Sequence, residues 1–343
     1  MTAPPIDLRS DTVTRPCDGM RRAMAAAEVG DDVLDGDPTT RRLERATAEL
    51  LGMEDALFFP SGTQANQTGI GLCTRPGTEL VLEANAHLVN YEHAGVAALW
   101  GVQIRPVAAP DGRLTASLVR QALRSASPHL PRVSAVAVEN THNFAGGRVL
   151  PLEEMAAIVA AAQQAGLAVH LDGARLWNAA AALGVAPARV VRGATTVMVS
   201  YSKGLGCPVG SCLVFARERR AEAWEIRKRL GGGMRQSGIL AAAGLYALEH
   251  HLPEIARDHE HARLLADRLG GLLAVRVPGP ETNIVMIDLT REGDDAERVA
   301  PRLAAAGLLL SPYGPRRLRA VTHRDVGAAD IGRAAGILRS VLG

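Results

Sequence analysis

The amino-acid sequence predicts an α/β protein with a mostly parallel central sheet flanked by helices, followed by a smaller C-terminal α+β domain. Two observations predict this class. Short apolar runs of strand type alternate with helical patterns through much of the chain, which is typical of βαβ units. The 343 residues, 47% of them hydrophobic, can also bury a core large enough for two unequal domains.

Each expected strand is a short apolar run bounded by turn residues. Six such runs should form the central sheet: Leu80–Leu82, Gln103–Val107, Ala135–Glu139, Leu167–Leu171, Thr195–Ser200 and Ser211–Phe215. A helical pattern at Ile239–His251 then leads into a region with three further runs: Leu272–Val277, Ile284–Leu289 and Arg317–Val321. Helices at about Asp295–Ala306 and Asp330–Leu342 should cover this second, smaller sheet. We therefore expect an N-terminal arm plus a large domain at residues 1–245 and a small domain at residues 246–343.

Composition disfavours several functional classes. The net charge is +2 and aromatic residues make up 3% of the chain, without a dense basic segment that contains aromatics, so nucleic-acid binding has little support. The Ala-rich stretch at residues 156–165 is interrupted by Gln163 and Gln164, and we expect no membrane association. The N-terminus has no basic stretch followed by an apolar one, which favours a cytoplasmic location. The four cysteines form no Cys-x-x-Cys pair, which predicts free thiols and no metal site.

Charged side chains follow two of the expected strands. Asp172 ends the run Leu167–Leu171, and Lys203 comes shortly after Thr195–Ser200. Ligands of open α/β sheets lie outside the carboxyl ends of the strands. An aspartate and a lysine at neighbouring strand ends suit pyridoxal phosphate, because the lysine forms a Schiff base and the acid pairs with the pyridinium nitrogen. Each segment alone could be a simple turn or loop, but together they favour a cofactor lysine.

Two further segments are candidates for binding an anionic group. Ser61, Gly62 and Thr63 follow an apolar run and should open a helix, whose first N–H groups and dipole attract phosphate. Ordinary capping of the helix by Ser61 or Thr63 would explain the same residues without a ligand. The second segment, from Lys228 to Arg235, places a glycine run between cations, but a solvated basic loop has the same pattern.

Taken together, the motifs of this chain closely resemble those of the L-threonine aldolases, pyridoxal phosphate enzymes of the aspartate aminotransferase fold (fold type I). The resemblance runs from about residue 6 to Val326, with the motifs in the same order. Its motifs are Asp7–Thr14, Gly30–Val33, Ser61–Thr63, Glu139–Asn143, His170–Arg175, Ser202–Gly206 and Gly231–Gln236. The set is far more specific than any one member.

The resemblance implies roles for the matching residues. Lys203 would carry the cofactor, Asp172 would pair with its ring nitrogen, and the Ser61–Thr63 segment would bind its phosphate. Ser10, Arg175 and Arg319 would grip the substrate carboxylate, which a guanidinium fork matches well. In the cofactor site, Arg175 would also lie beside the pyridoxal group.

Two histidines and a second pair of cations complete the implied site. His87 would stack on the cofactor ring and, with water, take a proton from the substrate hydroxyl. His129 resembles a second histidine that approaches that hydroxyl. Lys228 and Arg235 would reach the phosphate from the neighbouring subunit, so the site implies a homo-oligomer, with a dimer of dimers suggested by the family.

The implied activity is aldol cleavage of L-threonine, L-allo-threonine and related β-hydroxy-α-amino acids to glycine and an aldehyde. Other pyridoxal phosphate reactions on amino acids, such as β-elimination, racemisation or hydroxymethyl transfer, use the same lysine and stay open as alternatives. One position departs from the family pattern. Leu34 stands where relatives usually carry an aromatic residue, which would widen the substrate mouth if this position lines it.

Overall fold

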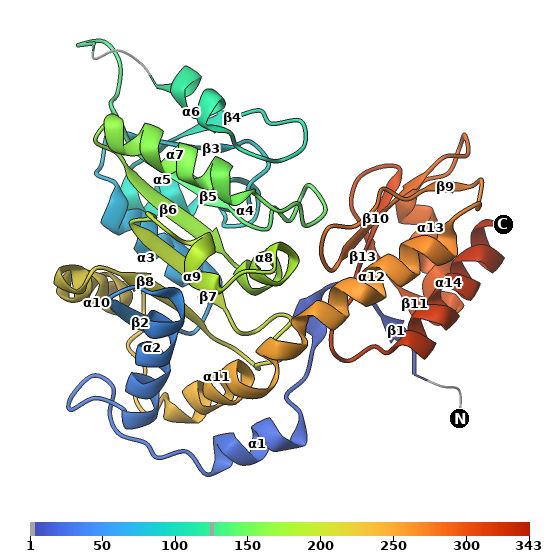
Figure 1. Ribbon diagram of the computed structural model, residues 1–343, viewed down its shortest axis with the longest axis horizontal. Helices are drawn as coiled ribbons and strands as arrows, with labels where there is room; N and C mark the ends of the chain where they lie inside the picture. The colour runs from blue at the N-terminus through green and yellow to red at the C-terminus, as the bar shows by residue number, and fades with distance from the viewer. Residues whose placement is uncertain (1–3, 124–126) are drawn as a thin grey trace.

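Two lobes of unequal size form the computed structural model, which describes residues 4–123 and 127–343 (Figure 1). The larger lobe contains a seven-stranded sheet of order β2-β8-β7-β6-β5-β3-β4. Its strands are β2 (Asp55–Phe59), β3 (Glu79–Glu83), β4 (Gln103–Val107), β5 (Val133–Glu139), β6 (Ala168–Gly173), β7 (Thr196–Ser200) and β8 (Ser211–Phe215). The five strands from β3 to β7 are parallel, and β8 runs antiparallel to both of its neighbours. The predicted fold class is confirmed.

Side chains that alternate along the strands bury both faces of this sheet. Val136 and Val138 of β5 belong to one apolar cluster, while Ala135 and Ala137 belong to another on the opposite face. The helices that contribute to the cluster on the first face include α2 (Pro38–Leu51), α6 (Ala116–Ala122), α7 (Leu152–Gln164), α8 (Leu176–Leu183), α9 (Pro187–Val190) and α11 (Gly238–His250). The opposite face is covered by α3 (Gly62–Cys73), α4 (His87–Asn90), α5 (Gly95–Trp100) and α10 (Arg220–Arg229).

A four-stranded antiparallel sheet of order β12-β13-β10-β9 forms the smaller lobe. Its strands are β9 (Val275–Arg276), β10 (Ile284–Leu289), β12 (Ser311–Pro312) and β13 (Arg317–Val321), and helices α12 (Ile255–Leu269), α13 (Ala296–Ala305) and α14 (Ala328–Leu342) complete it. The first predicted strand of this region is shorter than expected, because residues 272–274 form turns that leave Leu273 91% exposed. Helix α12, which the sequence pattern did not indicate, runs between the two lobes (Figure 1).

The N-terminal segment links the two lobes. Strand β1 (Ile6–Asp7) pairs in parallel with β11 (Leu308–Leu309), and Ile6 and Leu8 are buried in the core of the smaller lobe. A 3-10 turn at Asp11–Val13 then leads to helix α1 (Asp18–Ala25), which packs against α11 of the larger lobe. The chain therefore carries residues 8–14 across the gap between the lobes. Within the described ranges, no helix combines the length and the apolar character needed to cross a membrane.

Candidate active site

Three neighbouring parallel strands bring polar side chains to one edge of the larger sheet. Glu139 at the end of β5 lies opposite Asp172 near the end of β6, and β7 ends at Ser200, three residues before Lys203. Helix α3 begins at the same edge, since Phe59 of β2 pairs with Ser211 and Ser211 pairs with Ser200. A cavity of about 200 Å³ opens beside this edge. Its lining residues are Ser10, Thr12, His87, Tyr91, Glu139, Thr141, Asn143, Ala174, Arg175, Lys203, Tyr313 and Arg319.

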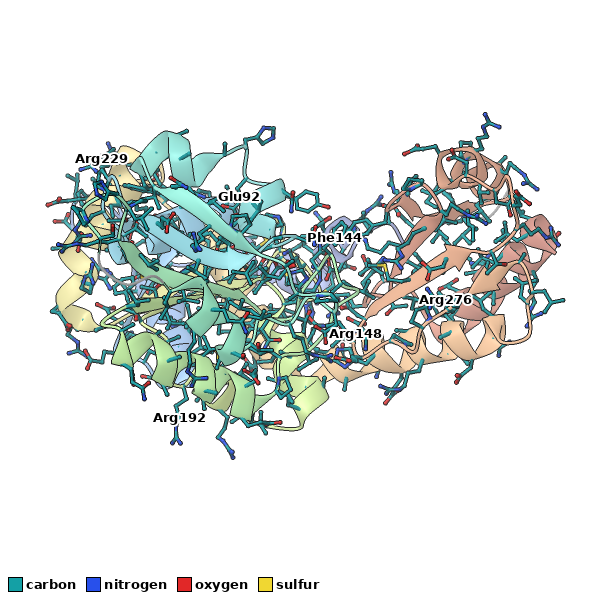
Figure 2. All side chains as sticks on the ribbon, turned by 90° about the horizontal axis from the view of Figure 1, so that it is seen from above. Glu92, Phe144, Arg148, Arg192, Arg229 and Arg276 are labelled. Carbon is teal, nitrogen blue, oxygen red and sulfur yellow. The ribbon has the colours of Figure 1, made fainter. Side chains whose placement is uncertain are left out.

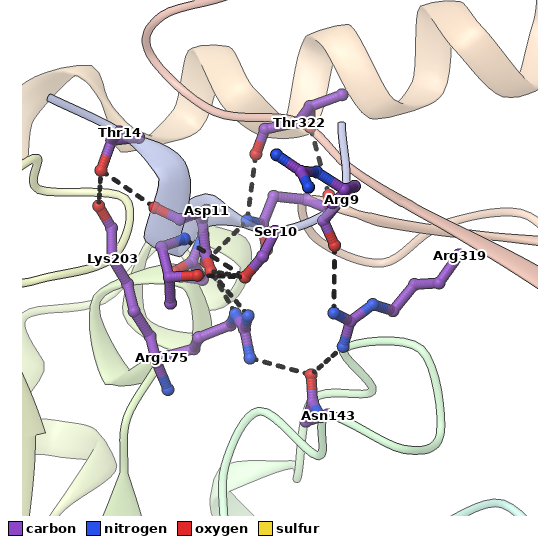
Figure 3. Close-up of polar contacts among 12 residues, drawn as sticks. Arg9, Ser10, Asp11, Thr14, Asn143, Arg175, Lys203, Arg319 and Thr322 are labelled. Carbon is purple, nitrogen blue, oxygen red and sulfur yellow. Dashed lines mark hydrogen bonds and ion pairs between the residues drawn. The ribbon is translucent and has the colours of Figure 1, made fainter. Parts of the chain in front are cut away.

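The amine of Lys203 makes no hydrogen bond or ion pair with the described residues, although its carbonyl oxygen accepts one from Thr14 Oγ1 at 2.8 Å (Figure 3). Burial lowers the pKa of the amine, and the nearby Arg175 guanidinium lowers it further. A lysine in this state is a nucleophile suited to Schiff-base formation. The composition also indicates that a lysine is required at this position, because Lys203 and Lys228 are the only lysines among the 38 Lys and Arg residues of the chain. This bias was a signal that the motif search did not use.

Two guanidinium groups face the cavity next to Lys203. Arg175 donates from Nε and Nη2 to the two carboxylate oxygens of Asp11, at 2.8 and 2.7 Å. Burial alone would raise the pKa of the Asp11 carboxyl. The charge and hydrogen bonds of Arg175, the charge of Lys203 and the hydrogen bond from Asn283 together outweigh burial and lower that pKa to about 2. The second guanidinium, of Arg319, lies over the ring of Tyr313 at 4.5 Å from its centroid. The pKa of the Arg319 guanidinium is lowered by burial and by the charge of Arg175.

Asn143 joins the two arginines. Its Oδ1 atom accepts a hydrogen bond from Arg175 Nη1 at 3.0 Å and another from Arg319 Nη1 at 2.9 Å (Figure 3). Its amide nitrogen donates to the Tyr313 hydroxyl at 2.8 Å. The buried Nε of Arg319 has no partner among the described residues. This arrangement suits a carboxylate ligand, because an acceptor oxygen already lies between two guanidinium groups and one donor remains free.

His87 begins helix α4, where its backbone N–H donates to Glu139 Oε2 at 2.7 Å. Its Nδ1 lies 3.0 Å from Glu92 Oε1, and its ring stacks on Tyr91 with 5.4 Å between the centroids. Burial opposes a charged imidazole, but the hydrogen bond with Glu92 and the charge of Asp172 outweigh it and raise the pKa of His87.

The residues present fit a pyridoxal phosphate group. Asp172 is buried and its two oxygens accept hydrogen bonds from Ala174 N at 3.1 Å and Asn66 Nδ2 at 2.9 Å. At the start of α3, Ser61 Oγ accepts from Gln64 N at 3.2 Å, and the first N–H groups of the helix lack acceptors within it. The buried Ser211 Oγ, which has no partner among the described residues, lies at the same edge. Ser61, Gly62 and Thr63 therefore lie near the cavity without lining it.

Besides Asp172 and the Ser61–Thr63 segment, four further residues singled out in the sequence do not line this cavity. His129 is exposed on the loop between α6 and β5, and Leu34 is 74% exposed in the turn that follows Gly30. Arg235 forms an exposed ion pair with Asp31 at 3.1 Å, and Lys228 lies beside Gly233. Their predicted roles stay predictions. Conversely, the motif search gave no role to Asn143, Glu92 or Tyr313, which the structure places at or next to the cavity.

The comparisons with known proteins agree with this site. Residues 7–292 match the family model described as β-eliminating lyase. The low-specificity L-threonine aldolase 1 of Arabidopsis thaliana is 42% identical over 334 residues, covering 95% of this chain and 93% of that protein. The low specificity L-threonine aldolase of Escherichia coli K12 is 40% identical over 338 residues, with 98% and 99% covered.

The chain belongs to the L-threonine aldolase family. The threonine aldolase structure of Leishmania major shares the fold, with a TM-score of 0.85 at 20% identity, and covers 99% of this chain and all of its own. At the level of this family, the predictions of a carbon–carbon lyase and of pyridoxal phosphate as its cofactor are confirmed.

A buried acid, Asp258, lies next to Gly204, the residue after Lys203, and should make the stability of this threonine aldolase family member depend on pH. Burial and the nearby Asp11 raise the pKa of Asp258 to about 8, against an ordinary value of 3.8. Between these values the folded chain keeps a proton that the unfolded chain releases, so stability falls as pH rises through this window. We expect Asp258→Asn to be more stabilising near pH 8 than near pH 5, by on the order of 3 kcal/mol. Urea titrations of both proteins at the two pH values measure this difference.

The control for this experiment is Asp267→Asn, because Asp267 is exposed on the same helix α12. Its effect on the free energy of unfolding should be nearly the same at both pH values. An equal effect of Asp258→Asn at the two pH values would contradict the assignment of a protonated Asp258.

Proposed function

We propose that this protein cleaves L-threonine, L-allo-threonine and related β-hydroxy-α-amino acids to glycine and an aldehyde. The observation that carries the proposal is the grouping of Lys203, the Arg175–Asn143–Arg319 arrangement and His87 around one cavity. This cavity combines an amine for the cofactor, a binding position for an α-carboxylate and a proton acceptor. The named relatives from Arabidopsis thaliana and Escherichia coli support the same substrate.

Different residues of the chain would bind the cofactor, orient the substrate and transfer the proton. Lys203 would hold pyridoxal phosphate covalently, the start of α3 would bind its phosphate, and Asp172 would keep its ring nitrogen protonated. When bound, the cofactor supplies an electron sink for the pair released by Cα–Cβ cleavage. Arg319 and Arg175 orient the substrate through its carboxylate, with Ser10 beside them. His87 receives the proton of the β-hydroxyl group, directly or through water.

An assay of both products tests the proposal. Purified protein with a visible absorbance band from bound cofactor is mixed with L-threonine, alcohol dehydrogenase and NADH. We expect steady loss of NADH from acetaldehyde and formation of glycine in equal amount. A cofactor band with neither product from threonine or allo-threonine would contradict aldol cleavage. In that case, 2-oxobutyrate or D-amino acid in the same mixture would identify β-elimination or racemisation.

A shared site in a homo-oligomer, with a dimer of dimers as its form, is part of the proposal. It is supported by the exposed positions of Arg235 and His129, which lie outside the cavity of their own chain. Lys228 and Arg235 of one subunit would contact the phosphate held by another, and His129 would approach the substrate hydroxyl in the same manner.

Mixed oligomers test this arrangement. Lys203→Ala and Arg235→Ala should each be nearly inactive alone, but hybrids that contain both subunits should recover up to about a quarter to a half of native activity, because intact sites form between complementary subunits. The measurement is the cleavage rate of hybrids isolated with two different affinity tags. Hybrids of Lys203→Ala with Asp172→Asn are the control, since both changes lie in the same half of the site and should give no recovery. Absence of recovery in purified Lys203→Ala and Arg235→Ala hybrids would count against shared sites.

A further inference from the structure

A buried carboxylate, Glu92, lies behind His87 and takes part in none of the roles assigned above. Its side chain is 0% exposed. One oxygen, Oε1, lies 3.0 Å from His87 Nδ1 and accepts from Asn66 Nδ2 at 2.9 Å. The other oxygen, Oε2, accepts from Gln67 Nε2 at 2.7 Å. A buried carboxylate is costly unless hydrogen-bonded and paired, and His87 is the one titratable group among these three partners.

The same network extends to Asp172. The amide nitrogen of Asn66 donates to Glu92 and also to Asp172 Oδ2, at 2.9 Å in each case. The orientation of this amide is fixed from its other side, where Asn66 Oδ1 lies 3.1 Å from His170 Nε2. Burial lowers the pKa of His170 to about 4, so its ring is neutral and Nε2 carries the hydrogen that Asn66 accepts. One amide thus connects the acid behind His87 with the acid assigned to the cofactor ring.

The backbone after Glu92 is strained. His93 and Ala94 are the two described non-glycine residues with positive φ, at 49° and 57°, and they follow one another directly. Both are exposed, so their side chains do not explain the conformation through packing. The turn that they form returns the chain to α5, where Gly95 N donates to the Glu92 carbonyl at 2.9 Å. Strain of this kind persists where the surrounding structure requires it, and here it brings a carboxylate into the space behind His87.

We propose that Glu92 is a positioning residue for proton transfer at His87. It holds the imidazole with its hydrogen on Nδ1, which leaves Nε2 as the atom that accepts a proton on the cavity side, and it stabilises the imidazolium that results. The proposal rests on the proposed function. In the step concerned, the hydroxyl proton moves to Nε2 and the O–H electron pair forms the second bond of the aldehyde carbonyl. The pair of the broken Cα–Cβ bond stays with the glycine fragment.

The charges around His87 give the expected sign of a change at Glu92. Glu92 and Asp172 raise the pKa of His87, Lys203 and burial lower it, and the Glu139 carboxylate lies at its backbone N–H. Glu92→Gln keeps the shape of the side chain and one acceptor oxygen but removes the charge at Nδ1. The pKa of His87 should therefore fall, and the neutral imidazole should become a weaker base.

Histidine-selective NMR of the holoenzyme tests this directly. The ten histidines are labelled, the His87 signal is assigned by its loss in His87→Asn, and both nitrogens are followed through a pH titration. In Glu92→Gln we expect the pKa of His87 to fall by about one unit or more. The acidic limb of the kcat/KM profile should move to lower pH by the same amount, and kcat should fall roughly tenfold with little change in KM. Glu92→Asp, which keeps the charge, should recover part of the shift.

Glu83→Gln is the matched control. His142 Nε2 lies 2.9 Å from Glu83 Oε2 in a buried pair of the same kind, and neither residue lines the cavity. This variant should lower the pKa of His142 and leave the His87 titration in place. An unchanged His87 pKa in Glu92→Gln, or a lower kcat without a shift of the acidic limb, would overturn the proposal. The titration needs no turnover, so it tests the effect of Glu92 on the pKa of His87 separately from the proposed function. If the native protein cleaved no substrate, the proposed function would be contradicted. A shift of the His87 titration in Glu92→Gln would still show that Glu92 sets the pKa of His87.

Discussion

Replacing Lys203 by alanine should abolish cleavage, with a loss of at least about a thousandfold, because Lys203 is the only lysine among the described residues that line the cavity. The chain contains one alternative lysine, Lys228, which does not line the cavity. Reduction of the native holoenzyme with borohydride should therefore fix the cofactor to a single peptide. The measurement is the mass of the modified peptide together with the residual cleavage rate of the variant.

Lys228→Arg is the matched control for this prediction, since it removes the second lysine and keeps its charge. The cofactor should still be fixed to the peptide that contains Lys203. Labelling of Lys203→Ala at Lys228, or cleavage by Lys203→Ala at a rate near that of the native protein, would contradict the assignment. Because the chain has only two lysines, the experiment leaves no third residue to explain a modified peptide.

Much of this site could be predicted because its chemistry lies in short segments of the sequence. Lys203 and Asp172 follow apolar runs of strand type, and the β6–β7 pairing brings these strand ends together as parallel neighbours. Arg175 follows Asp172 closely enough for the same motif to include it. Six of the seven strands of the central sheet were predictable for the same reason, because each is a separate apolar run between turn residues, whereas β2 (Asp55–Phe59) was not among the predicted strands.

The residues that the motif search missed depend on contacts between distant segments. Asn143 lies in a recognised motif, but its bridge to Arg319 spans 176 positions along the chain. Tyr313 follows the short strand β12, which no apolar pattern indicated, and it faces the cavity through the packing of the smaller lobe against the larger one. The position of Phe144 between the two lobes is visible in Figure 2. Contacts of this kind follow from the tertiary structure, and local sequence patterns do not predict them.

The second of the two largest effects is expected for Asp172→Asn, which should retain bound cofactor and lower kcat by about a hundredfold or more. The carboxylate is held by Ala174 N and by Asn66 Nδ2, and both are donors. An asparagine can satisfy one of them with its oxygen, but its own amide then faces the other donor. The variant therefore loses the negative charge that keeps the ring nitrogen protonated, and it also disturbs the amide that reaches Glu92.

The visible absorbance band and the cleavage rate of Asp172→Asn separate these effects. Retention of the band with a steep fall in kcat is the expected result, and cleavage at a nearly native rate would show that another group serves the ring nitrogen. Asn66→Asp provides a comparison, because it puts a carboxylate where the shared amide donor was and brings it against two acids at hydrogen-bond distance. If Asp172 acts through its charge alone, Asn66→Asp should lower kcat less than Asp172→Asn does. If both variants lose activity to the same degree, the hydrogen-bonded unit of Asp172, Asn66 and Glu92 is what the reaction requires.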